Sequence, residues 1–172
     1  MKKIFIVLAS SLILFGCGSK KTTTNIPTEA PRSFELKETD KPEISLTPRE
    51  DGHMIYLKIS KIPTFVTNME YELIYKAVED KLEIEKGVGD TIKIDKDTIS
   101  RDLLLGTESC TSGCKYKFDE GITGGSINLT LITKDGQSAT IEKSFKLTQD
   151  KKTKKFVITI EENAVPSTSS DQ

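Results

Sequence analysis

Apolar and polar residues alternate along most of the chain between residues 34 and 161. In one clear run, Tyr71, Leu73 and Tyr75 alternate with Glu72 and Ile74. A period of two is typical of half-buried antiparallel strands, and no apolar run sustains the period of 3.6 that marks a helix. The alternation predicts strands at 43–48, 53–60, 69–77, 81–86, 90–95 with 98–105, 125–133, 138–148 and 154–161.

Turn residues separate these runs. Asp51-Gly52 precedes one predicted strand, Gly87-Val88-Gly89-Asp90 separates two, and Lys134-Asp135-Gly136-Gln137 links two more. Glycine and aspartate in such pairs supply the positive φ of tight hairpin turns. Seven or eight short strands at this spacing predict an all-β fold, a two-sheet antiparallel sandwich.

The segment Tyr71-Glu72-Leu73-Ile74-Tyr75-Lys76 resembles the third strand of fibronectin type III and other immunoglobulin-like domains. The resemblance implies an immunoglobulin-like sandwich over residues 34–161. The chain has no tryptophan and no widely spaced cysteine pair, which separates it from antibody-type domains. Because many functions share this fold, the resemblance implies no ligand.

The first residues have the pattern of an export signal. Lys2 and Lys3 precede an apolar stretch, Ile4–Phe15, which would be about 18 Å long as a helix. That length is well short of the roughly 30 Å hydrocarbon core of a membrane, so a spanning helix is not expected. The pattern predicts a signal peptide.

The four residues Leu14-Phe15-Gly16-Cys17 resemble the lipobox of bacterial lipoproteins. The resemblance implies cleavage after residue 16 and lipidation of Cys17 with acyl chains such as palmitate. Two or three such chains give lasting attachment to a membrane. We therefore expect a signal peptide at 1–16, an acylated cysteine with a flexible stalk at 17–33, and a disordered tail at 162–172. The expected location is extracytoplasmic, anchored by lipid to a bacterial membrane of the cell envelope.

Charge and composition limit the classes of function that the chain could have. Removal of residues 1–16 takes away two lysines and changes the net charge from −1 to −3, which gives no general attraction to nucleic acid. The chain has a single histidine, His53, which follows a turn. The sequence contains no G-x-S-x-G motif that would present a serine for this histidine to activate. We expect no catalytic residue, no cofactor and no enzyme activity.

Cys110 and Cys114 are the cysteines that remain beside Cys17. Outside the cytoplasm two such neighbours usually form a disulfide, which here would brace the connection from Gly106 to Gly125. A redox pair is the alternative, although the spacing is not C-x-x-C. Zinc is disfavoured because His53 alone could add an imidazole ligand.

A set of four aspartates and a run of lysines leave further alternatives open. Asp90, Asp95, Asp97 and Asp102 could gather a calcium ion, but they fail the pattern of a calcium loop and are expected to be solvated. The basic run Lys151-Lys152-Thr153-Lys154-Lys155 is expected to form a solvated hairpin tip, with contact to anionic lipid or cell-wall polymer as the alternative.

These observations predict a lipid-anchored module with a binding or structural role in the cell envelope. Its loops, notably the Gly106–Gly125 segment, would contact an envelope protein or polysaccharide. One alternative is a small envelope redox protein or enzyme that uses Cys110 and Cys114. Another is a calcium-stabilised adhesion module.

Overall fold

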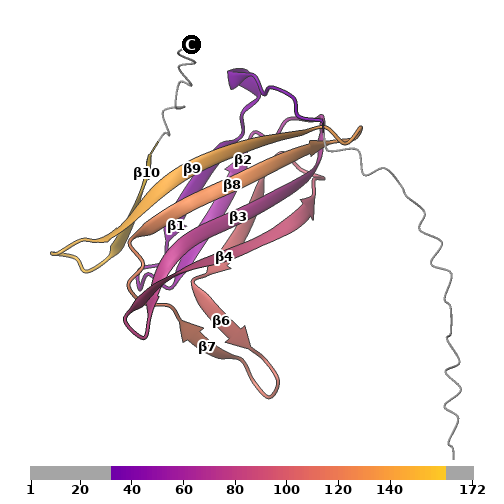
Figure 1. Ribbon diagram of the computed structural model, residues 1–172. Coiled ribbons are helices and arrows are strands. Elements are labelled where there is room, and N and C mark those ends of the chain that lie inside the picture. The colour runs from indigo at the N-terminus through magenta and orange to yellow at the C-terminus, as the bar shows by residue number, and fades with distance from the viewer. Residues whose placement is uncertain (1–31, 162–172) are drawn as a thin grey trace, which may run out of the picture.

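Alternating side chains build two facing antiparallel sheets in the computed structural model, which describes residues 32–161 (Figure 1). A short 3-10 turn, η1 (Glu38–Asp40), precedes the strands. The strands are β1 (Glu43–Pro48), β2 (Met54–Ser60), β3 (Val66–Glu79), β4 (Leu82–Lys93), β5 (Ile99–Leu104), β6 (Gly106–Ser109), β7 (Lys115–Phe118), β8 (Gly124–Thr133), β9 (Ser138–Gln149) and β10 (Phe156–Glu161). Among these residues no helix is long and apolar enough to cross a membrane.

The strand order confirms the predicted all-β sandwich. One sheet has the order β1-β2-β5 and the facing sheet has the order β10-β9-β8-β3-β4, which gives the sandwich eight strands. In the lettering of immunoglobulin-like domains, β1, β2 and β5 take the places of strands A, B and E, and β3, β8 and β9 those of C, F and G. Strand β10 extends the larger sheet beyond β9, and β6 and β7 form a separate two-stranded ribbon.

The core lies between the two sheets and is made of the inward residues of each alternating run. Leu57 on β2, Leu73 on β3 and Leu129 on β8 are each no more than 1% exposed. Burial of such side chains stabilises the fold by about 1.5–3 kcal/mol each. In β2, β3 and β8 the residues that the alternation predicts to face inward are therefore the residues that the structure buries.

Two predictions about connections are wrong. The glycines at 87 and 89 do not form a turn, because β4 runs through them and stays paired with β3, with Gly87 opposite Ile74 and Gly89 opposite Glu72. The long connection after Gly106 is not a simple loop, since it contains the hairpin of β6 and β7. At Gly87 and Gly89 a ladder of backbone hydrogen bonds outweighs the local turn preference of glycine.

The sandwich has two distinct ends. At one, which we call the entry end, the amide of Ser138 donates to the carbonyl of Arg32 (3.0 Å) and the amide of Phe34 donates to the carbonyl of Ser138 (3.1 Å). Strand β9 then runs from Ser138 to Gln149, about 36 Å at the usual rise per residue. The β1–β2 turn, the β6–β7 hairpin and the β9–β10 turn lie at the opposite end, which we call the far end (Figure 1).

The predicted signal peptide, Cys17, most of the stalk and the tail lie outside the described residues. The turns at Asp51-Gly52 and Asp135-Gly136 are confirmed: Gly52 has φ of 75° and Gly136 has φ of 78°. These are left-handed conformations that glycine adopts without steric cost.

Candidate functional site

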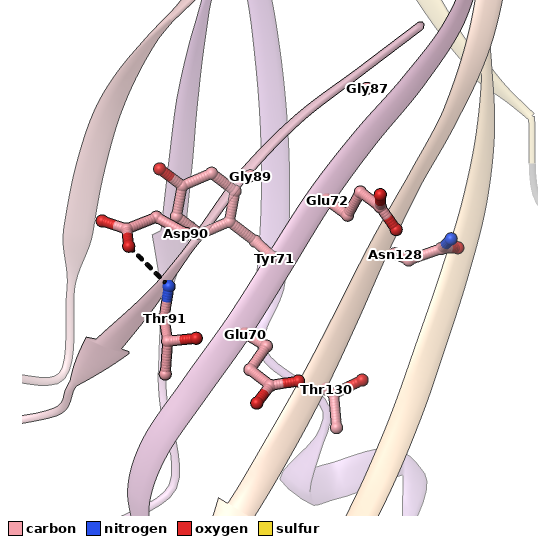
Figure 2. Close-up of a pocket in the computed structure, with 9 residues that line it drawn as sticks. All are labelled: Glu70, Tyr71, Glu72, Gly87, Gly89, Asp90, Thr91, Asn128 and Thr130. Atoms are coloured by element: carbon pink, nitrogen blue, oxygen red, sulfur yellow. Dashed lines mark hydrogen bonds between the residues drawn. The ribbon is translucent and has the colours of Figure 1, made fainter. Parts of the chain in front are cut away.

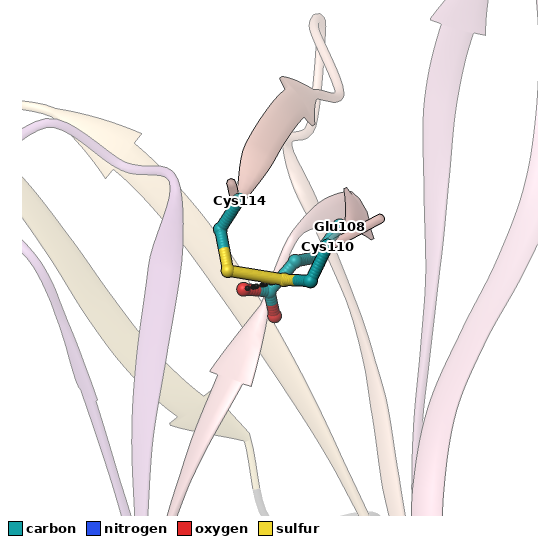
Figure 3. Close-up of a disulfide and its surroundings, with 3 residues drawn as sticks. All are labelled: Glu108, Cys110 and Cys114. Carbon is teal, nitrogen blue, oxygen red and sulfur yellow. Dashed lines mark hydrogen bonds between the residues drawn. A yellow bond between two sulfur atoms is a disulfide. The ribbon is translucent and has the colours of Figure 1, made fainter. Parts of the chain in front are cut away.

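The hairpin of β6 and β7 is an exposed element of the far end. Its two strands pair from Gly106 opposite Phe118 to Ser109 opposite Lys115, and every residue from 107 to 117 is exposed. A disulfide between Cys110 and Cys114 closes the tip (Figure 3). An isolated two-stranded hairpin is only marginally stable in water, so the disulfide and the contacts at the base hold this one in place.

A partly buried polar cluster fixes the base of the hairpin to the larger sheet. The Tyr75 hydroxyl donates to Asp119 Oδ2 (2.8 Å), and Lys86 Nζ donates to Asp119 Oδ1 (2.5 Å). The Asp119 side chain is only 5% exposed, so both bonds satisfy a carboxylate that is removed from water. Burial, and then the hydrogen bond to Asp119, raise the pKa of Tyr75 above its ordinary value.

Further contacts join the hairpin to the end of β3. The amide of Val78 donates to the carbonyl of Glu120 (2.8 Å), and Lys117 Nζ lies 2.6 Å from Glu79 Oε1. The salt bridge is exposed and worth little by itself. Together with the Asp119 cluster, these contacts make the hairpin a rigid projection of the sandwich.

Aromatic rings form a row along one face of the hairpin. His53 stacks on Phe118 with ring centroids 4.2 Å apart, and Tyr116 lies parallel to Phe118 on its own strand with centroids 6.0 Å apart. The Arg49 guanidinium lies 5.8 Å from the Phe118 centroid, within the range of a cation–π contact. Tyr116 is 52% exposed, so the row ends in an aromatic face open to solvent.

The β1–β2 turn is braced beside this row. Asp51 accepts from Arg49 Nε (2.7 Å) and from the backbone amide of His53 (3.0 Å). The Arg49 side chain holds the pKa of Asp51 below its ordinary value. His53 follows the Asp51-Gly52 turn, as predicted, and lies just before β2 rather than within it. Its stacking on Phe118 was not predicted, because Phe118 is 65 positions later in the chain.

The cysteines form one group that could in principle hold a metal. Within residues 32–161, Glu108, Cys110 and Cys114 have ligand atoms within 4.8 Å of one another. With both sulfurs in a disulfide neither is the thiolate that ligates metals, so the oxidised hairpin does not offer a metal centre. The four aspartates considered for calcium do not form such a group in this part of the chain.

The outer face of the larger sheet carries a shallow groove of about 450 Å³ (Figure 2). The residues that line it include Glu70 and Glu72 on β3, Asn128 and Thr130 on β8, and Gly87 and Gly89 on β4. The glycines open this groove because they place no side chain on the outer face. The groove was not predicted from the sequence, because the same glycines indicated a turn.

A second hollow of about 560 Å³ lies at the entry end. Phe34 and Phe65 line it and meet edge to face with ring centroids 6.0 Å apart. Lys37, Lys134 and Asp135 surround the two rings. This hollow adjoins the point where the described chain begins.

Comparison with known proteins yields no relative: no family model matches the sequence, and no curated protein and no solved structure matches it either.

Proposed function

We propose that this protein is a lipid-anchored binding module of the bacterial cell envelope, attached through Cys17 and presenting its far end to a partner. The observation that carries the proposal is the placement of the two ends. The described chain begins beside Ser138, and the disulfide-closed hairpin projects from the other end of strands β3 and β9. A stalk that enters at one end holds the hairpin away from the membrane.

The disulfide supports a location outside the cytoplasm, because such bonds persist in oxidising compartments. The lipobox at residues 14–17 supports attachment by lipid. The fold supplies the rigid frame on which exposed turns act as recognition elements.

The aromatic row supports recognition by the far end. Tyrosine and arginine are enriched among the residues that dominate binding energy at interfaces, and Tyr116 and Arg49 are both at this end. The partner we propose is an envelope protein or polysaccharide that packs against the open face of Tyr116.

The exposed disulfide favours one second candidate, a redox role for Cys110 and Cys114. A thiol titration in glutathione buffers separates the two functions. A disulfide that stays oxidised at the potential of a glutathione pool supports the bracing role, and one that is readily reduced supports the redox role.

Retention on isolated cell envelopes tests the binding proposal. The lipidated chain and its Tyr116→Ala variant are each held in neutral phosphatidylcholine nanodiscs, so that the acyl chains are already inserted, and are then added to envelopes from cells that lack the protein. Removal of the ring is expected to weaken retention about tenfold or more, the effect of a residue at the centre of an interface. Phe65→Ala is the matched control, because it removes a 42% exposed ring at the entry end. Equal retention of the wild type and the Tyr116 variant would contradict the proposal.

A further inference from the structure

Three lysines at the far end have no acidic partner among the described residues. Lys151, Lys152 and Lys154 lie in the β9–β10 turn and are exposed. Within residues 32–161 none of them forms a salt bridge, whereas other lysines of the same sheet do: Lys76 pairs with Glu83 (2.7 Å) and Lys146 with Glu161 (2.6 Å). The turn therefore presents three ammonium groups that no side chain neutralises.

The one carboxylate of the turn is engaged with the backbone instead. Asp150 Oδ1 accepts from the amides of Lys152 (2.9 Å) and Thr153 (2.7 Å) and from the Thr153 hydroxyl (3.0 Å). These bonds shape the turn, and they lower the pKa of Asp150, with the Thr153 amide contributing most. The carboxylate is thus used to order the loop rather than to pair with its lysines.

The turn is also fixed at its base. The amide of Asp150 donates to the carbonyl of Lys155 (2.9 Å), and Gln149 Nε2 donates to the carbonyl of Lys154 (2.8 Å). The Lys155 side chain reaches Glu50 of the β1–β2 turn (2.5 Å). The three free ammonium groups are therefore carried on an ordered tip, which reduces the entropy lost when they bind a ligand.

We propose that the β9–β10 turn is a docking site for a phosphate-bearing polymer of the cell envelope. The inference rests on the proposed function, since it takes the far end to be the end that meets partners. Lysine ammonium groups are compact point charges that bind phosphate, and three of them on one turn match a repeating anionic chain.

Two observations favour an envelope polymer over anionic membrane lipid and over nucleic acid. The turn lies about 36 Å along β9 from the entry end, so it points away from the membrane that the stalk would reach. Residues 150–155 contain no aromatic side chain on which a nucleobase could stack, and single-stranded nucleic acids are typically bound through such stacking. The site recognises the phosphates of the chain and not the groups between them.

The test uses the full-length chain in neutral phosphatidylcholine nanodiscs and measures its affinity for poly(glycerol phosphate). The variant Lys151→Gln/Lys152→Gln/Lys154→Gln removes the three charges. We expect its Kd to rise about tenfold or more, and the dependence of log Kd on log salt to become shallower, because fewer counterions are released.

The matched control is Lys37→Gln/Lys96→Gln/Lys134→Gln, which removes three exposed lysines near the entry end that form no salt bridge within the part of the chain that the structure describes. Its Kd should stay within about twofold of the wild type. Equal affinity of the wild type and the turn variant, an equal loss in the control, or no binding of the polymer by the wild type would each overturn the proposal. So would tighter binding to phosphatidylglycerol vesicles than to the polymer.

A Tyr116→Ala chain separates this inference from the proposed function. It is expected to bind poly(glycerol phosphate) as the wild type does, because its turn lysines are intact. If retention on envelopes depends on Tyr116 while the polymer is not bound, the inference about the turn fails alone. If the polymer is bound through the lysines but Tyr116 is dispensable for retention, the turn is a site and the role of the aromatic row fails.

Discussion

The Tyr75 hydroxyl donates a 2.8 Å hydrogen bond to Asp119, a residue 44 positions later in the chain. Tyr75 belongs to the buried face of β3, and Asp119 follows the last strand of the exposed hairpin. This bond joins the element that organises the core to the element that we propose for recognition. The orientation of the hairpin therefore depends on the stability of the sandwich.

Loss of this hydroxyl should loosen the hairpin. Tyr75→Phe keeps the ring in the core and leaves the buried Asp119 with Lys86 as its remaining partner. We expect the free energy of unfolding to fall by about 1–3 kcal/mol, the usual cost of a lost bond to a buried charged group. Urea unfolding measures the change. Tyr56→Phe is the control, because Tyr56 is 40% exposed, and a loss as large in this control would contradict the assignment.

The same bond predicts a response to alkaline pH. The pKa of Tyr75 is raised in the folded protein by burial and by Asp119, whereas the unfolded chain has the ordinary value of about 10. A pKa that is higher in the folded state gives stability that is complete below pH ~10 and is lost as the pH rises above it. The free energy of unfolding should decline above pH ~10, and less steeply in Tyr75→Phe. Parallel profiles for the two chains would contradict the prediction.

Removal of the disulfide should act locally. For a five-residue ring, the loss of chain entropy corresponds to about 2 kcal/mol, and the hairpin tip lies outside the core. Cys110→Ser/Cys114→Ser should lower the global free energy of unfolding by at most about 2 kcal/mol. Hydrogen exchange should show faster exchange of amides between Gly106 and Phe118, with unchanged protection in β8. Loss of protection throughout the sandwich would show that the disulfide has a global role.

Two glycines with similar backbone conformations should differ in their tolerance of alanine. At Gly52 an added Cβ would lie 2.7 Å from the Phe156 ring, whereas at Gly136 nothing lies within 4 Å. Both changes carry the cost of a positive φ, and only Gly52→Ala adds a steric clash. We expect Gly52→Ala to lower the free energy of unfolding by about 1–3 kcal/mol more than Gly136→Ala does. Equal losses would mean that Phe156 moves aside freely.

Sequence alone predicted the strands whose side chains alternate and whose turns carry aspartate and glycine. The turn at Asp51-Gly52 and the strand around Leu73 are examples, because period and turn chemistry are local properties. The prediction failed at Gly87 and Gly89, where pairing with the 14-residue strand β3 carries β4 through a segment that resembles a turn.

The candidate site was predicted only in part. Cys110 and Cys114 could be paired because they are close in sequence and outside the cytoplasm in the expected location. The contacts of Asp119 with Tyr75 and of Phe118 with His53 join residues that are 44 and 65 positions apart, and no local pattern records them. These contacts determine the direction in which the hairpin projects. That direction could therefore not be predicted from the sequence.

The central claim is that Cys17 holds this sandwich on a membrane and leaves its far end free. Intact-mass spectrometry of the chain extracted from cell membranes tests the attachment directly. We predict a polypeptide that begins at Cys17 and carries the added mass of a diacylglyceryl group. An unmodified chain that still contains residues 1–16 would contradict the claim.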